Sequence, residues 1–198
     1  MAIYALKPAF RKALSPLGRG LIGAGISADV VTVMGVMFAV LGGFGIWLGR
    51  HGDAWLLLLP LGAFLRTAAN ALDGWIAQET QTSRPVGEVL NETADRVGDV
   101  AIFLPVAFVH APPQLLLAGT LSAMLVTSFL GIAVKAAGGR RVYTGVMGKP
   151  DRMVVMGVAG IAGVYFDPGT VFTVALWVVL VGVAITLVQR AVIARREL

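Results

Sequence analysis

The sequence predicts an all-α, polytopic membrane protein with six transmembrane helices. Of the 198 residues, 57% are hydrophobic and only 14% are charged, whereas a soluble domain carries about 25% charged residues. Apolar stretches recur along the chain at close to the length of roughly 20 residues that a helix needs to cross the hydrocarbon core. Lysine and arginine gather in alternate connections between these stretches, which is typical of a multi-pass membrane protein.

The composition also excludes several classes of site. The chain has no cysteine, so it has no disulfide framework, thiol nucleophile or thiolate metal site. Its two histidines, His51 and His110, are far apart in the sequence, which argues against a histidine-based metal centre. The net charge of +5 is spread over the connections, so nucleic acid is not an expected partner. The N-terminal residues lack the pattern of a cleavable signal peptide.

Six apolar stretches are each expected to form a membrane-spanning helix. They are Asp29–Leu48, Ala54–Gln78, Val86–Val109, Pro113–Ala136, Arg152–Phe166 and Thr170–Ala191. The fifth stretch is the shortest. We expect one unit over residues 1–198, with a cytoplasmic or interfacial segment at 1–28, the membrane domain at 29–191 and a cytoplasmic tail at 192–198.

The basic residues predict the orientation. The connections Gly49–Asp53, His110–Pro113 and Asp167–Gly169 contain a single basic residue, Arg50. Because positively charged loops remain in the cytoplasm, both termini are expected there. The segment Ala9–Leu17 mixes apolar and basic side chains, and two interpretations stay open: an amphipathic helix on the cytoplasmic interface, or a basic flank that fixes the orientation.

Polar side chains concentrate on two neighbouring spans. A charge within a span costs about 2.5–3.5 kcal/mol on insertion scales and usually serves a function. The second span carries Arg66, Asn70 and Asp73, and the third carries Glu88, Asn91, Glu92, Asp95, Arg96 and Asp99. These two spans are therefore the place to look for a site.

The spacing aligns these polar residues on two helix faces. Asn70, Asp73 and Ala77 share one face of the second span, and Asn91, Asp95 and Asp99 share one face of the third. The spans are antiparallel and joined by a short polar loop, so we expect Asp73 at the depth of Asp95, and Asn70 at the depth of Asp99. An inward-facing group of carboxylates and amides is predicted near the cytoplasmic side.

Clustered carboxylates of this kind favour a bound cation, because they repel one another without one. Ligand sets made only of oxygen suit Mg²⁺, Mn²⁺ or Ca²⁺ rather than zinc. A magnesium ion usually completes its shell with water and substrate phosphates. Gly74 and Gly87 leave room for a ligand to approach. A substrate bearing a diphosphate and entering from the cytoplasm fits these features.

The same residues resemble the signature of the CDP-alcohol phosphotransferase superfamily, D-x-x-D-G-x-x-A-R-x8-G-x3-D-x3-D. The chain has N-A-L-D-G-W-I-A-Q at residues 70–78, then eight residues, then G-E-V-L-N-E-T-A-D at 87–95. Five residues match the signature: Asp73, Gly74, Ala77, Gly87 and Asp95. Three differ, with Asn70 and Asn91 in place of aspartate and Gln78 in place of arginine.

The resemblance implies a fold, a reaction and roles for individual residues. In that family the four carboxylates hold two divalent cations, Mg²⁺ or Mn²⁺, and the last aspartate takes a proton from an alcohol. The alcohol attacks the β-phosphorus of a CDP-linked lipid such as CDP-diacylglycerol, and CMP leaves. Asp95 would be the catalytic base. The implied metal-binding set is Asp73, Asp95, Asn70 and Asn91, and the implied nucleotide-binding set is Asp73, Gly74, Ala77 and Gly87.

The departures from the signature leave two interpretations. In the first, the site is active: Asp99, Glu88 or Glu92 replaces the missing carboxylate charge, and Arg84 or Arg96 replaces the missing guanidinium. In the second, the chain is a catalytically silent relative that binds lipid or nucleotide or supports a partner enzyme. Asp99 lies one turn beyond Asp95 and is the strongest substitute metal ligand, but an ion pair with Arg66 would equally neutralise it.

A basic loop at residues 138–152 supplies candidate phosphate ligands. Four basic residues of this loop are candidates to bind a phosphate of the acceptor or donor, namely Lys149, Arg152, Arg140 and Arg141, with Lys149 and Arg152 favoured because they flank the start of the fifth span. The alternative is attraction to anionic lipid headgroups. A small transporter is a third function class, which the absence of an inverted repeat or broken helix disfavours.

The resemblance places the protein in phospholipid biosynthesis, in a bacterial inner membrane with the active site facing the cytoplasm. It leaves the acceptor alcohol open. It also implies a homodimer by analogy.

Overall fold

The computed structural model describes residues 7–109 and 114–198, and within these ranges all regular secondary structure is helical. The α-helices are α2 (Lys7–Gly23), α3 (Ala28–Leu48), α4 (Leu58–Glu79), α5 (Pro85–Phe103), α6 (Gln114–Ala136), α7 (Lys149–Ala162) and α8 (Pro168–Glu197). Short 3-10 turns form η1 (Gly49–His51), η2 (Asp53–Leu57) and η3 (Leu104–Phe108). The all-α prediction is confirmed.

Four helical segments of the described ranges are long and apolar enough to cross a membrane. They are Ala28–His51, Asp53–Glu79, Gln114–Ala136 and Pro168–Glu197. Helix α7 has 14 residues, which at 1.5 Å per residue is about 21 Å, and α5 carries the charged residues of the site. Six spans and the cytoplasmic placement of the termini therefore remain predictions.

The helix boundaries differ from the predicted spans for local reasons. Ser27 caps α3 by accepting a hydrogen bond from the Val30 amide. Helix α5 ends at Phe103, ahead of Pro105, because proline removes a backbone donor and crowds the preceding turn. In α7, Pro150 stands in the first turn, and the Asp151 carboxylate accepts a hydrogen bond from the Gly148 amide. The start of the predicted span Pro113–Ala136 and the connection His110–Pro113 lie outside the described residues.

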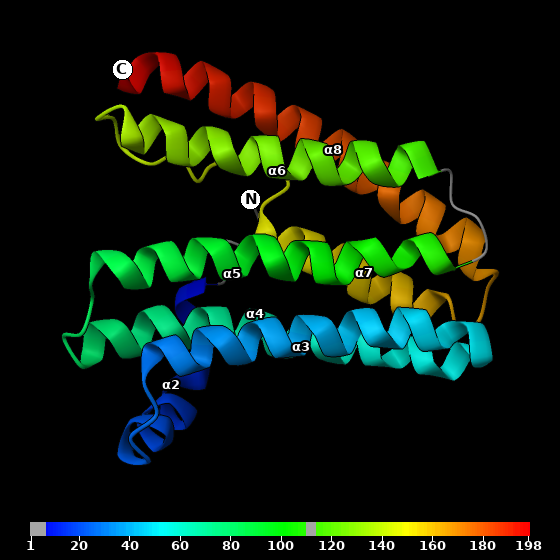
Figure 1. Ribbon diagram of the computed structural model, residues 1–198, viewed down its shortest axis with the longest axis horizontal. Coiled ribbons are helices and arrows are strands. Elements are labelled where there is room, and N and C mark those ends of the chain that lie inside the picture. Colours follow the sequence, from blue (N-terminus) through cyan, green and yellow to red (C-terminus); the bar gives the residue numbers. More distant parts are fainter. Residues whose placement is uncertain (1–6, 110–113) are drawn as a thin grey trace.

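The helices form two packed groups that α7 connects (Figure 1). Helices α3, α4 and α5 lie side by side, α6 pairs with α8, and α7 packs on both α4 and α8. Glycines allow the close approach of the first group. A Cβ atom on Gly62 would lie 2.5 Å from the Phe38 carbonyl oxygen, and one on Gly43 would lie 2.0 Å from that of Ala101. Small residues serve this purpose at helix contacts in membranes.

Helix α2 packs against α4 through a small apolar cluster of its own. Leu14, Leu21 and Ile22 of α2 contact this cluster, which is centred on residues such as Leu72. The Trp75 ring lies over Gly18, where a Cβ atom would come within 2.3 Å of it. The segment Ala9–Leu17 is therefore helical, and both interpretations of it, an amphipathic helix at the membrane interface or a basic flank, stay predictions.

The connection between α6 and α7 is held against α6 and α8 by hydrogen bonds. The Arg190 guanidinium donates hydrogen bonds to the carbonyl oxygens of Thr127, Tyr143 and Thr144 at 2.8–3.2 Å. The Met147 amide donates to the Thr186 hydroxyl at 2.9 Å. These contacts direct the basic loop towards the polar faces of α4 and α5.

Candidate active site

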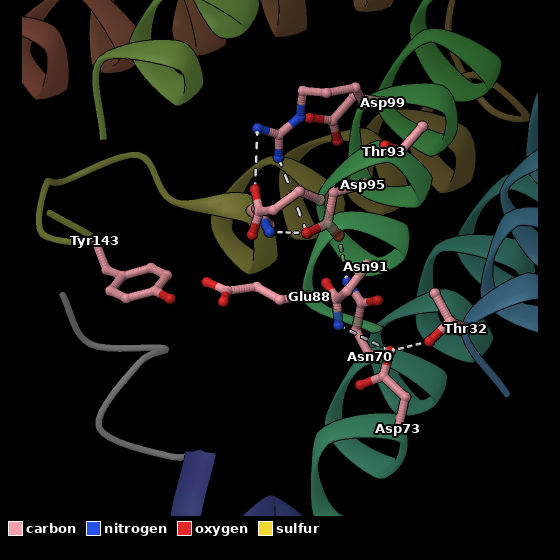
Figure 2. Close-up of polar contacts among 12 residues, drawn as sticks. Thr32, Asn70, Asp73, Glu88, Asn91, Thr93, Asp95, Asp99 and Tyr143 are labelled. Atoms are coloured by element: carbon pink, nitrogen blue, oxygen red, sulfur yellow. Dashed lines mark hydrogen bonds and ion pairs between the residues drawn. The ribbon is translucent and has the colours of Figure 1, made fainter. Parts of the chain in front are cut away.

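The polar faces of α4 and α5 contact each other through amide–carboxylate pairs (Figure 2). Asn91 Nδ2 donates to Asp73 Oδ2 at 3.1 Å, and Asn70 Nδ2 donates to Asp95 Oδ1 at 2.9 Å. The prediction that Asp73 lies level with Asp95, and Asn70 level with Asp99, was wrong by one helical turn. Asp73 stands six positions before the end of α4 and Asn91 six positions after the start of α5, so these two residues share a depth.

Asp73 is buried and held on several sides. The Thr32 hydroxyl of α3 donates to Asp73 Oδ2 at 3.0 Å, and the Gly74 amide donates to Asp73 Oδ1 at 2.5 Å. With Asn91, these contacts fix the direction of the carboxylate. Thr32 was not among the predicted site residues, because a threonine in a helix can satisfy its hydroxyl on the carbonyl oxygen four residues earlier, and Thr32 Oγ1 also lies 3.1 Å from that of Ala28.

Asp95 is almost completely buried, with 1% of its surface exposed. Besides Asn70, it contacts the Lys149 ammonium group at the start of α7. Two arginines are more distant: Arg66 Nη2 lies 3.8 Å and Arg96 Nη2 lies 3.9 Å from the Asp95 carboxylate. A buried carboxylate requires such compensation to remain ionised, so Asp95 is a negatively charged group enclosed by cations.

Asp99 forms the ion pair that the sequence left as an alternative to metal binding. Arg66 Nη1 lies 3.2 Å from Asp99 Oδ1, and Arg152 Nη2 lies 2.7 Å from Asp99 Oδ2. All three side chains are buried. Arg66 passes over Gly98, where a Cβ atom would lie 2.5 Å from the Arg66 Nε. Both carboxylate oxygens of Asp99 are therefore occupied by guanidinium groups, which argues against Asp99 as a substitute metal ligand.

The two glutamates of α5 also pair with basic residues. Glu88 Oε2 accepts a hydrogen bond from Lys135 of α6 at 2.6 Å. Glu92 contacts the Arg141 guanidinium of the basic loop. These contacts draw α6 and the loop towards α5, and they leave Asp73 and Asp95 as the carboxylates between α4 and α5.

A small cavity next to this cluster is strongly basic. Its lining side chains come from α5, α6, the basic loop, α7 and α8: Arg96, Ser128, Arg141, Val142, Tyr143, Lys149, Arg152 and Arg190. Lys149 and Arg152, two of the predicted phosphate ligands, line this cavity, and their binding of a phosphate stays a prediction. Arg140 does not line it: its side chain is 89% exposed and pairs with Glu197. Arg141 of the loop lines the cavity in its place, and the sequence does not show which side of the loop faces inward. Arg190 of α8 was not a candidate from the sequence.

The predicted nucleotide-binding positions lie towards the ends of α4 and α5 nearest their connecting loop. Gly74 lies beside Arg11 of α2, and Gly87 beside Asp29. Ala77 is partly exposed, and Gln78, which replaces the arginine of the signature, is exposed. Their role in binding a nucleotide stays a prediction.

The residues between α4 and α5 offer oxygen atoms as cation ligands, and metal binding there stays a prediction. Within residues 7–109 and 114–198, no three Asp, Glu or His side chains converge as a metal-binding group. Asn70 donates to Asp95 and Asn91 donates to Asp73, and the carbonyl oxygen of each amide is chemically suited to bind a hard cation. Two carboxylates and two amides match the oxygen ligands that Mg²⁺ and Mn²⁺ prefer, so these four residues would be suited to hold such an ion.

Proteins of known name match most of this chain. It is 32% identical to the inner membrane protein YnbA of Escherichia coli, over 89% of this chain and 88% of that protein. It is also 32% identical to phosphatidylinositol phosphate synthase of Mycolicibacterium smegmatis, over 93% of this chain and 84% of that enzyme. No protein-family model matches the chain.

Solved structures of Mycobacterium tuberculosis phosphatidylinositol phosphate synthase share the fold. One, in complex with manganese and citrate, aligns with a TM-score of 0.75 and 26% identity over 90% of this chain and 87% of that chain. Another, with CDP-DAG bound, aligns with a TM-score of 0.75 and 27% identity over 92% and 94%. With these relatives and the apolar helices, the chain is an integral membrane protein, and it belongs to the CDP-alcohol phosphotransferase family.

Proposed function

We propose that this membrane phosphotransferase moves the phosphatidyl group of CDP-diacylglycerol onto a phosphorylated alcohol and releases CMP. The observation that carries the proposal is the contact of the buried Asp95 carboxylate with Lys149, which lines a cavity together with several arginines. This places an ionised base beside a site for an anion. The related synthases, one of them solved with CDP-DAG, support the donor.

Asp95 acts as the general base. It takes the proton of the acceptor hydroxyl, whose oxygen attacks the β-phosphorus of the donor, and the bond from that phosphorus to CMP breaks. Asn70 holds one oxygen of Asp95, and the Lys149 ammonium group contacts the other. These two contacts orient the carboxylate and keep it ionised, as a base requires.

Asp73 and Asp95, with Asn70 and Asn91, would hold a divalent cation. Such a cation neutralises the phosphates of the donor and the charge that develops on the leaving CMP. A related synthase crystallised with manganese supports this assignment. In our proposal the two asparagines reduce the charge of the ligand set without abolishing activity, because amide oxygens still bind hard cations.

The basic cavity binds the phosphate of the acceptor. Lys149, Arg152 and Arg141 line it, and planar guanidinium groups match phosphate oxygens in pairs. The phosphatidylinositol phosphate synthases among the relatives make inositol phosphate the first acceptor to test. Because positively charged loops remain in the cytoplasm, the site faces the cytoplasm in this proposal.

The test is CMP release by the purified protein from CDP-diacylglycerol, with Mg²⁺ or Mn²⁺ and a panel of alcohols. We expect release that EDTA stops and that Asp95→Asn lowers about 10²- to 10⁴-fold, the usual contribution of a general base. Full activity of folded Asp95→Asn would refute the assignment of the base. No CMP from any acceptor would favour a silent relative that binds lipid or nucleotide.

A further inference from the structure

Arg11 of α2 reaches the surface of α4 where the donor nucleotide is proposed to bind. A Cβ atom on Gly74 would lie 3.2 Å from Arg11 Nη2, so the guanidinium group occupies the space that a side chain would fill. Gly74 directly follows Asp73, a proposed cation ligand. Arg11 therefore lies next to the turn of α4 that contains the Asp73 carboxylate and Gly74, which has no side chain.

The charge of Arg11 is not committed to a protein partner. Its Nε atom is buried and has no hydrogen-bond partner in the described ranges. The nearby Asp73 carboxylate accepts its hydrogen bonds from Thr32, Gly74 and Asn91 rather than from Arg11. A buried donor without a partner is costly, and a bound anion would satisfy it.

The position of Arg11 is fixed by the packing of its helix. Leu14 of α2 belongs to the apolar contacts with α4, and Trp75, the neighbour of Gly74, covers Gly18. Arg11 is thus presented to Gly74 by a docked helix rather than by a free terminus. In contrast, Gln78, at the signature position of an arginine, is neutral and exposed near the end of α4.

We propose that Arg11 binds the diphosphate of the CDP-linked donor, in place of the arginine that Gln78 replaces. This inference rests on the proposed function. It gives α2 a part in donor recognition, because Arg11 of α2 would bind the donor phosphates together with residues of α4 and α5. Arg11 could bind any phosphate group, including those of membrane lipids. The test must therefore distinguish the diphosphate of the donor from the phosphates of bulk lipid.

The test compares Arg11→Gln with Lys12→Gln in purified, detergent-solubilised protein. Lys12 is the exposed neighbour on the same helix, so both variants lose one positive charge. We measure equilibrium binding of CDP-diacylglycerol and of soluble CDP, and the KM for CDP-diacylglycerol. Arg11→Gln is expected to weaken binding of both ligands about tenfold or more, as loss of a charged hydrogen bond does, and to raise this KM. Lys12→Gln is expected to match the wild type.

Two further variants make the test specific. Arg11→Gln combined with Gln78→Arg is expected to recover part of the lost affinity. Arg11→Lys keeps the positive charge and the packing of the aliphatic part of the side chain, so it is expected to fold normally and to lose less affinity for both ligands than Arg11→Gln.

Arg11→Gln binding both ligands as tightly as Lys12→Gln would overturn the inference and leave the proposed function intact. Weaker binding of CDP-diacylglycerol without weaker binding of soluble CDP would also overturn it, since Arg11 would then contact the lipid portion rather than the diphosphate. A wild-type protein that neither binds CDP-diacylglycerol nor releases CMP would refute the proposed function itself.

Discussion

At the scale of single residues, two adjacent arginines of the basic loop have opposite surroundings. Arg141 lines the cavity beside Lys149 and stacks over the Tyr143 ring, with 4.3 Å between its Cζ atom and the ring centroid. Arg140 points outward to Glu197. The sequence could not distinguish them, because a loop without periodicity does not show which side chains face inward.

This contrast supplies a matched pair of variants. Arg141→Gln is expected to raise the KM for the phosphorylated acceptor about tenfold, since it removes a charged phosphate contact, while the KM for CDP-diacylglycerol stays the same. Steady-state CMP release at varied acceptor concentration measures both constants. Arg140→Gln is the control and should behave as the wild type. Equal acceptor KM values for the two variants would contradict the assignment of the cavity.

At the scale of helices, the sequence predicted the long apolar helices well. It predicted the arrangement of the two helices that carry the polar residues, α4 and α5, only in part. Helices α3 and α6 lie within a few residues of their predicted spans, because a continuous apolar run has one stable form in lipid. The signature placed Asp73 and Asp95 together between α4 and α5. Their register was not predictable, since it depends on the residues at which the two helices end.

Close helix contacts should fail when a glycine there gains a methyl group. Gly43→Ala would place a Cβ atom 2.0 Å from the Ala101 carbonyl oxygen and force α3 away from α5, which costs about 1–3 kcal/mol by the usual effect of overpacking. Thermal unfolding in detergent measures this as a lower Tm. Gly119→Ala on α6 is the control, because within the described residues no group lies within 4 Å of its Cβ position. A Tm for Gly43→Ala equal to that of Gly119→Ala would exclude this packing.

At the scale of the whole molecule, the charge distribution predicts which ends of the helices face the cytoplasm. The chain lacks cysteine, so single-cysteine variants report on one position each. Ser83→Cys, in the loop between α4 and α5, should react with a membrane-impermeant maleimide only after intact cells are permeabilised. Asp53→Cys, in η2 at the opposite ends of the spans, should react from outside. The reverse labelling pattern would show that the protein has the opposite orientation in the membrane. The homodimer implied by the family resemblance stays a prediction at this scale.

The measurement that tests the central claim most directly is identification of the lipid product by mass spectrometry. The wild-type protein is supplied with CDP-diacylglycerol, Mn²⁺ and equal amounts of inositol and inositol phosphate. The account predicts a metal-dependent phosphatidyl product that retains the phosphate of the acceptor, formed together with CMP. A product made from unphosphorylated inositol alone would contradict the role of the basic cavity. CMP release without any new lipid would contradict phosphotransfer to an alcohol.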